Sequence, residues 1–169
     1  MLLSITINNY TLVDTLEIEF SGGTTAITGE TGAGKSLVLD ALGMALGDRA
    51  DTGTIRHGKD RAEITATFDI ATIDSAQVWL AQQDFHAEDQ QCILRRLYTT
   101  EGRSRGYING QPCTMQQLQT LGEMLTDIHS QHEHQSLLRR ETHRRLLDEY
   151  CGNIDLSSEV SDHFSTWQL

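Results

Sequence analysis

Residues 29–36 read Gly-Glu-Thr-Gly-Ala-Gly-Lys-Ser and match the pattern G-x-x-x-x-G-K-[ST]. The pattern constrains the fold, because it requires a tight loop between a strand and a buried helix. Its three glycines let successive backbone N–H groups point inward, and the positive end of the following helix completes a nest for an anion. We therefore predict an α/β fold with a phosphate-binding loop. The predicted loop residues are Gly29, Glu30, Thr31, Gly32, Ala33, Gly34, Lys35 and Ser36.

Two residues of this loop add side-chain chemistry to the backbone nest. Lys35 brings a compact positive charge to the β- and γ-phosphates of a nucleotide, which makes it a candidate catalytic residue as well as a binding residue. The Ser36 hydroxyl is a hard oxygen ligand that suits Mg²⁺. The chain has no Asn-Lys-x-Asp sequence of the kind that recognises guanine. The expected ligands are therefore ATP and Mg²⁺.

The segments around the loop have the required context. Residues 2–8 and 12–20 are rich in Leu, Ile, Val and Thr and predict two strands, and 24–28 predicts a short third strand before the loop. Residues 35–46 are apolar nearly all round a helix, and Gly47 follows as a stop signal. A helix of this kind belongs in the interior of a layered fold.

Further along, strict alternation of apolar and polar residues over 62–70 predicts the clearest strand of the chain. Residues 92–99 and 103–109 predict two more strands with turns at Glu101-Gly102 and Asn109-Gly110. Short helices are predicted over 75–83, behind a capping box at 114–117, and over 141–150. We expect a mixed core sheet around the phosphate loop and an antiparallel part formed by 2–20 and 62–109.

The charge excludes a simple basic nucleic-acid-binding domain. The 169 residues carry 13 basic and 24 acidic side chains, a formal net charge of −11. Apolar residues at 38% and charged residues at 22% indicate a soluble globular protein, and no apolar run approaches a membrane span. The three cysteines form no Cys-x-x-Cys pair and the N-terminus has no secretory pattern, so we expect a protein of the reducing cytoplasm without a membrane partner.

Arginine is concentrated in two segments despite the negative total. Residues 95–105 hold Arg95, Arg96, Arg103 and Arg105, and residues 139–145 hold four more. Arginine suits bidentate contact with phosphate, so each cluster is a candidate DNA contact. The alternative is a solvated surface with local ion pairs.

Several segments in and around the loop resemble the RecN family, bacterial SMC-like ATPases of DNA double-strand-break repair. The similarity covers nearly the whole chain, and 127–138 is its most specific part. The other matching segments are 27–36, Asp40-Ala41-Leu42, Gly47-Asp48-Arg49-Ala50 and Tyr107-Ile108-Asn109-Gly110-Gln111. The resemblance implies a P-loop NTPase fold of the ABC/SMC head type, with residues 1–153 as its N-terminal lobe and 154–169 as the start of a truncated coiled-coil helix.

The resemblance also implies roles for two residues outside the loop. Arg49 matches the arginine loop near the nucleotide, and Gln131 matches the Q-loop glutamine, which reaches Mg²⁺ or the attacking water in catalysis. Two local matches are rejected. Leu146-Leu147-Asp148-Glu149 has too few apolar residues for a Walker B strand, and Leu156-Ser157-Ser158-Glu159 lacks the glycines of the ABC signature.

Four histidines near the Q-loop segment invite a metal reading, because imidazole is the commonest metal ligand. They are His129, His132, His134 and His143, and their spacing matches no evident zinc template. The other two interpretations are that these histidines belong to a polar loop beside the nucleotide, or that they are simple surface residues.

The expected function is ATP binding, with hydrolysis once a C-terminal lobe supplies the missing catalytic groups. Alone, this chain is expected to bind ATP and to hydrolyse it weakly or not at all. The expected partners are that lobe of the same protein, a second head in an ATP-bound homodimer, and DNA at the nucleoid during repair. The alternative is a nucleotide-gated DNA-bridging module of another SMC or Rad50-type protein, in which hydrolysis is secondary.

Overall fold

The computed structural model describes residues 1–29, 34–87, 89–126, 128 and 140–167. The chain forms two compact units, 1–128 and 129–169, and each is described by itself. Glu30, Thr31, Gly32, Ala33 and Gln131 lie outside the described residues, as do His129, His132 and His134.

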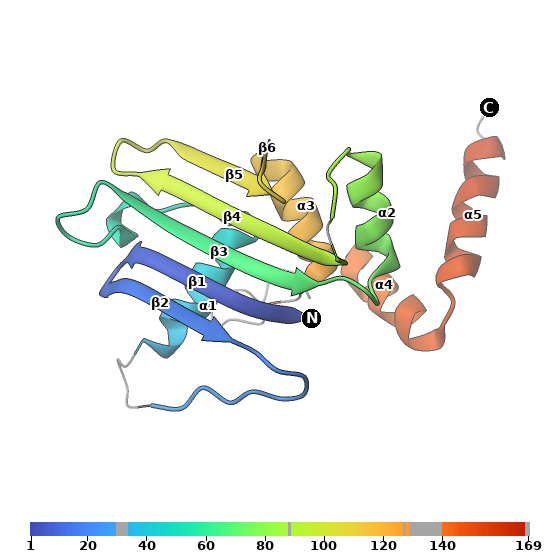
Figure 1. The fold of residues 1–169 in the computed structure, drawn as a ribbon. Helices are drawn as coiled ribbons and strands as arrows, with labels where there is room; N and C mark the ends of the chain where they lie inside the picture. The colour runs from blue at the N-terminus through green and yellow to red at the C-terminus, as the bar shows by residue number, and fades with distance from the viewer. Residues whose placement is uncertain (30–33, 88, 127, 129–139, 168–169) are drawn as a thin grey trace. The chain divides into compact units, whose positions relative to one another are not determined.

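The first unit is built on one six-stranded sheet with the strand order β2-β1-β3-β4-β5-β6 (Figure 1). Every pair of neighbouring strands within the described residues is antiparallel. The strands are β1 (Leu2–Tyr10), β2 (Val13–Glu19), β3 (Arg61–Asp69), β4 (Gln91–Thr99), β5 (Ser104–Ile108) and β6 (Gln111–Cys113).

The central strand β3 shows why the sheet has one buried face. Ala62, Ile64, Ala66 and Phe68 are fully buried, whereas the residues between them face the other side. Successive side chains of a strand point to opposite faces, so the period of two in the sequence becomes an apolar face and a polar face. The strand predicted over 62–70 is thereby confirmed.

Helices cover the apolar face of the sheet. The helix α1 (Lys35–Ala45) packs on β1, β3 and β4, and α3 (Met115–Leu125) packs on β5 (Figure 1). The helix α2 (Asp74–Gln82) contacts α3. The predicted capping box is present, because Gln117 N–H donates to Thr114 Oγ1 and Thr114 N–H donates to Gln117 Oε1.

One local prediction is wrong, and one short strand was not predicted. Residues 24–28 form no strand, because no strand among the described residues pairs with them, and Ile27 is 44% exposed. The described sheet is therefore the antiparallel part of the expected fold. The short edge strand β6 was not predicted, although the turn before it was: Asn109 and Gly110 have φ values of 49° and 79°, as a tight hairpin turn requires.

The described part of the second unit, residues 140–167, contains two helices, α4 (Arg140–Cys151) and α5 (Ile154–Trp167). Residues 146–149 lie inside α4 and residues 156–159 inside α5, so neither forms the strand of a Walker B motif or the loop of an ABC signature. The apolar residues that recur along α5 are exposed: Leu156, Val160, Phe164 and Trp167. No described helix is long and apolar enough to cross a membrane.

Candidate nucleotide-binding site

The described start of α1 has one backbone feature of a phosphate nest. Gly34 is the N-cap residue of α1 and adopts the left-handed conformation, with φ 82° and ψ 14°. Glycine adopts this conformation at little cost, and it has no side chain that could cover the first N–H groups of the helix. These N–H groups are therefore available to an anion at the positive end of the helix.

Lys35 connects the two ends of the predicted loop. Its ammonium group donates a hydrogen bond to the carbonyl oxygen of Gly29, six residues earlier. The bond holds the charge above the start of α1, and the neighbouring Ser36 is exposed. The described residues of the predicted loop, Gly29, Gly34, Lys35 and Ser36, thus lie together. This donor set, with backbone N–H groups, one ammonium and one hydroxyl, fits a magnesium–nucleotide complex.

The body of α1 fixes this loop to the sheet. Val38, Ala41, Leu42 and Ala45 are buried against the apolar face. Burial of such side chains contributes about 25 cal/mol for each Å² of apolar surface removed from water. The helix is therefore a rigid support for the phosphate-binding residues at its start.

The loop after α1 carries Arg49 and is folded onto the helix and the sheet. Gly47 has a φ of 111°, and the N–H of Asp48 donates to the carbonyl of Gly43 at 3.0 Å. Arg49 itself is exposed. The loop continues through a short 3₁₀ turn at Thr52–Thr54, where Asp51 accepts a hydrogen bond from the N–H of Gly53.

Arg96 is buried, which was not predicted from the sequence. It is 3% exposed and points to the helix side of the sheet, where its Nε donates to Ser104 Oγ at 2.8 Å. Burial lowers the pKa of its guanidinium, partly offset by nearby groups including Asp48. The cluster over 95–105 is therefore not one solvated surface. The apolar residues Cys92, Leu94 and Tyr98 alternate along β4 and lie on the same face as Arg96. This alternation could have predicted that Arg96 is buried.

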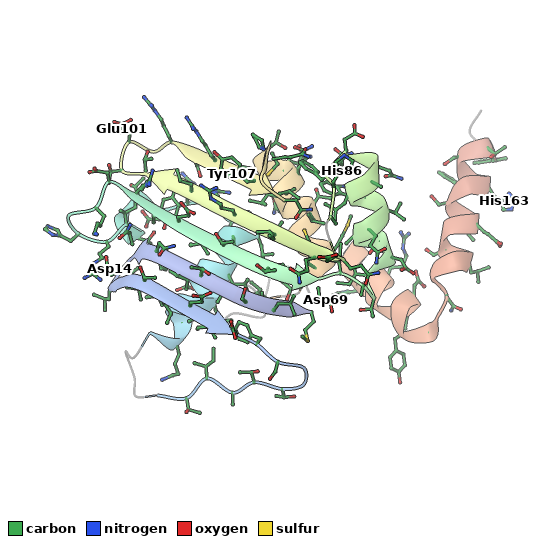
Figure 2. All side chains as sticks on the ribbon, in the orientation of Figure 1. Asp14, Asp69, His86, Glu101, Tyr107 and His163 are labelled. Carbon is green, nitrogen blue, oxygen red and sulfur yellow. The ribbon has the colours of Figure 1, made fainter. Side chains whose placement is uncertain are left out.

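The remaining arginines of that cluster lie on the open face or at the turn. Arg95 Nε lies 3.0 Å from Glu63 Oε1, and its guanidinium lies 4.9 Å from the centre of the Tyr107 ring. A hollow of about 430 Å³ beside them is lined by Arg61, Arg103 and Arg105, together with Asp60 and Glu101. Figure 2 shows Glu101 at the tip of the β4–β5 hairpin and Tyr107 on β5.

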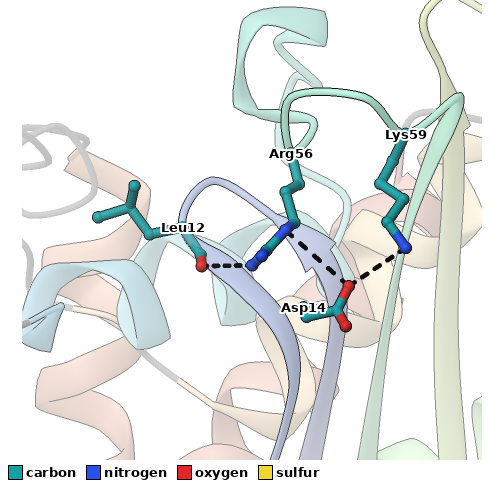
Figure 3. A network of polar contacts seen from close by, with 4 residues as sticks. All are labelled: Leu12, Asp14, Arg56 and Lys59. Carbon is teal, nitrogen blue, oxygen red and sulfur yellow. Dashed lines mark hydrogen bonds and ion pairs between the residues drawn. The ribbon is translucent and has the colours of Figure 1, made fainter.

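A polar network ties the end of the loop 48–60 to the β1–β2 hairpin (Figure 3). Arg56 Nη1 donates to the carbonyl of Leu12 at 2.6 Å. Asp14 Oδ1 lies 3.9 Å from Arg56 Nε and 3.3 Å from Lys59 Nζ. These side chains are partly exposed, so each ion pair contributes little to stability.

Two of the three thiols have a raised pKa. All three cysteines are free, and burial raises the pKa of Cys92 to about 12 and that of Cys113 to about 11. A thiol with a raised pKa is a weak nucleophile at neutral pH. Within the described ranges, no group of His, Cys, Asp and Glu is placed to hold a metal ion.

A buried helix that starts at a left-handed glycine and a lysine and packs on a sheet is typical of the P-loop class of nucleotide-binding domains. The chain belongs to the AAA domain family, whose sequence model matches residues 4–159.

Its sequence relatives include proteins named DNA repair protein RecN. The chain is 43% identical to RecN of Vibrio cholerae over 168 residues and 34% identical to RecN of Bacillus subtilis over 168 residues. These matches cover 99% of this chain, but only 30% and 28% of the relatives. The resemblance to RecN is thus confirmed, and the chain spans less than a third of the length of these relatives.

Comparison with solved structures confirms the fold class. One structure, reported in work on ATP-driven dimerization and DNA-stimulated activation of SMC ATPases, has a TM-score of 0.63 at 22% identity and covers 88% of this chain and 97% of its own. The SMC head domain from Thermotoga maritima has a TM-score of 0.55 at 20% identity and covers 70% of this chain and 41% of its own. The fold is that of SMC-type ATPase heads.

Proposed function

We propose that this chain is the N-terminal part of an ATPase head that binds Mg·ATP and acts in DNA double-strand-break repair. The observation that carries the proposal is the left-handed Gly34 at the start of buried α1, with Lys35 bonded back to Gly29. The names of the sequence relatives support the repair role. The proposed setting is the cytoplasm, at the nucleoid during repair.

Each proposed site residue has a distinct task. Residues 29–34 cradle the phosphates through backbone N–H groups, and Lys35 neutralises charge on the β- and γ-phosphates. Ser36 would hold Mg²⁺, which when bound would stabilise the negative charge that develops on the phosphates. Arg49 contacts the nucleotide from the loop after α1, and Gln131 orients Mg²⁺ or the attacking water.

Hydrolysis is proposed to need more than the described residues. The sequence has no Walker B strand ending in Asp-Glu and no ABC signature, so a C-terminal lobe is proposed to supply both. Two such heads then close over two ATP molecules, and hydrolysis reopens them. The domain proposal remains a lobe over 1–153 with a coiled-coil helix from 154.

The Ser36 assignment is tested by exchanging its hydroxyl. We expect Ser36→Ala in the full-length protein to weaken binding of Mg·ATP about tenfold, the equivalent of about 1.4 kcal/mol. The reason is that the alanine cannot ligate Mg²⁺. Calorimetric titration with ATP, once with Mg²⁺ and once with EDTA, measures the effect.

The matched control is Ser36→Thr, which retains a hydroxyl and should keep the Mg²⁺ dependence. Binding with EDTA should be the same in all three proteins. If Ser36→Ala keeps the parent's response to Mg²⁺, the metal role of Ser36 is refuted.

We also propose that the full protein contacts DNA through the hollow at the β4–β5 turn. Arg103 is paired with Glu101 at 3.4 Å but remains largely exposed, and Arg105 is exposed beside it. We expect the double variant Arg103→Glu, Arg105→Glu to bind duplex DNA more weakly. Each lost phosphate contact should flatten the slope of log affinity against log salt by about 0.9. Fluorescence anisotropy over a range of salt concentrations measures this slope.

A variant of opposite sign tests the same surface. Glu101→Lys adds positive charge to the hollow and should strengthen DNA binding and steepen the salt slope. If the salt slope is the same in the parent and in both variants, then Arg103 and Arg105 are solvated side chains that do not contact DNA.

A further inference from the structure

The hollow at the β4–β5 turn lies on the open face of the sheet, opposite the face that the helices of the first unit cover (Figure 2). Strand pairing places its residues in two neighbouring rows. Arg61 of β3 lies opposite Thr99 of β4, and the N–H of Thr99 donates to the carbonyl of Arg103 at 2.9 Å. In the next row on the same face, Leu97 lies opposite Arg105. Side chains from β3, β4 and the start of β5 thus line one hollow.

Three arginines make this hollow positive in a chain whose net charge is −11. Arg61, Arg103 and Arg105 outnumber the two acids that line it, Asp60 and Glu101. Arg103 lies 3.4 Å from Glu101, but both side chains are more than two-thirds exposed, so this pair is weak. Among the described residues, Arg61 and Arg105 have no ion-pair partner. Their guanidinium groups are therefore available to a phosphate.

Thr99 adds an unused hydroxyl between two of these arginines. Its Oγ1 is buried and has no hydrogen-bond partner within the described residues. A buried hydroxyl without a partner costs free energy that a ligand oxygen could offset. Adjacent strands lie about 4.8 Å apart, so the backbones of Arg61 and Arg103 flank Thr99 at a separation of about 10 Å. Two guanidinium groups with a hydroxyl between them are donors that suit a phosphate.

The other end of the hollow is apolar and aromatic. Tyr107 lies two residues after Arg105 on the same face of β5, diagonal to Leu97 of β4. The guanidinium of Arg95 lies 4.9 Å from the centre of the Tyr107 ring, and Arg95 Nε lies 3.0 Å from Glu63 Oε1. These contacts hold the ring, so a stacking partner loses little free energy in ordering it. An aromatic ring beside a positively charged groove is the arrangement on which proteins stack the bases of single strands.

We propose that this hollow binds one unpaired nucleotide of a DNA strand, with its phosphate on the arginines and its base on the Tyr107 ring. The volume of about 430 Å³ lies within the range of small-ligand sites, roughly 300–1,000 Å³. A base inside a duplex is stacked on both sides, so only an unpaired base can lie on the ring. The proposal rests on the proposed DNA contact at this turn, and it narrows that contact to strands that offer an unpaired base.

The test compares two dye-labelled strands of equal length, one of thymidine nucleotides and one abasic, which has the same phosphates but no bases. We expect the full-length parent to bind the thymidine strand about tenfold more tightly in fluorescence anisotropy. Tyr107→Ala should abolish this preference, whereas Tyr107→Phe keeps the ring and should retain it. The matched control is Tyr150→Ala, which removes a tyrosine that is 91% exposed in the second unit and should bind like the parent.

Arg61→Gln tests the phosphate part of the site. It should weaken binding of both strands by the same factor and flatten the slope of log affinity against log salt by about 0.7, the value for one phosphate of a single strand. An unchanged slope would show that Arg61 does not contact the phosphate, against the proposal.

The base preference decides whether the site exists. If Tyr107→Ala does not fold, Tyr107→Leu keeps an apolar side chain on β5 and carries the same comparison. Equal affinity of the parent for the two strands, or a preference that persists without the ring, would overturn the nucleotide site. Weaker duplex binding by the Arg103→Glu, Arg105→Glu variant would then still support the proposed DNA contact. If that variant also binds duplex DNA like the parent, the DNA contact at this turn is wrong as well.

Discussion

Lys35→Ala should abolish detectable ATP binding in calorimetry of the full-length protein. The ammonium of Lys35 sits at the start of α1, bonded to Gly29, and it is the only basic side chain in residues 1–48. A chain with a net charge of −11 repels the nucleotide, so the positive charge of Lys35 has to outweigh the negative potential of the other residues. We expect at least a hundredfold loss of affinity, equivalent to about 2.7 kcal/mol.

The chain offers a matched control, because it has only two lysines. Lys59→Ala removes the other one, which is exposed and paired with Asp14 at 3.3 Å, and should leave ATP binding unchanged. Alanine is a good helix former at the first position of α1, so Lys35→Ala should keep the parent's circular dichroism and melting temperature. Unchanged affinity in a folded Lys35→Ala protein would refute the assignment of residues 29–36 as the nucleotide site.

The conformation at the start of α1 was predictable because its geometry is local. The left-handed conformation of Gly34 and the start of the helix that follows depend on residues within the motif itself. The same holds for the capping box at Thr114 and the hairpin turn at Asn109, both confirmed by the structure. Short-range hydrogen bonds and glycine conformations are encoded where they occur.

Features that depend on distant segments were not predictable in this way. Residues 24–28 have the β-branched composition of a strand, but a strand also needs a hydrogen-bonded neighbour, and no described strand provides one. The hydrogen bond between the hydroxyls of Thr54 and Tyr98 joins residues 44 positions apart. No local pattern in residues 48–60 predicts the contact between Thr54 and Tyr98.

Arg96 is an intermediate case. Counting arginines along 95–105 suggested one charged surface, but strand alternation separates Arg96 from Arg95 by placing them on opposite faces. The period of two was a sufficient signal for its inward direction. Its contacts with Ser104 and Asp48 were not predictable, because they depend on how α1 and its loop pack on the sheet.

Gly47→Ala is expected to be among the most destabilising single substitutions in the first unit. Gly47 has a φ of 111°, and a Cβ placed there would lie 2.9 Å from the backbone N of Gln119 in α3. The neighbouring contact is equally close, because a Cβ on Gly122 would lie 2.8 Å from the carbonyl oxygen of Leu46. The end of α1 and the middle of α3 therefore meet at two glycines, and neither backbone can yield without moving a helix.

A second glycine can separate the cost of backbone strain at Gly47 from the cost of overpacking against α3. Gly58 has a φ of 81°, but a Cβ there would meet nothing within 4 Å, so Gly58→Ala should lose only about 1 kcal/mol from backbone strain. Gly47→Ala adds overpacking of about 1–3 kcal/mol, for a total of about 2–4 kcal/mol in urea denaturation. If both variants lose the same free energy of unfolding, then α1 and α3 can shift apart at no cost. In that case α1 is not the rigid support that the phosphate loop requires, and Gly47→Ala should leave ATP affinity unchanged. A larger loss in Gly47→Ala, together with weaker ATP binding, would instead show that the contact with α3 holds the start of α1 in its binding geometry.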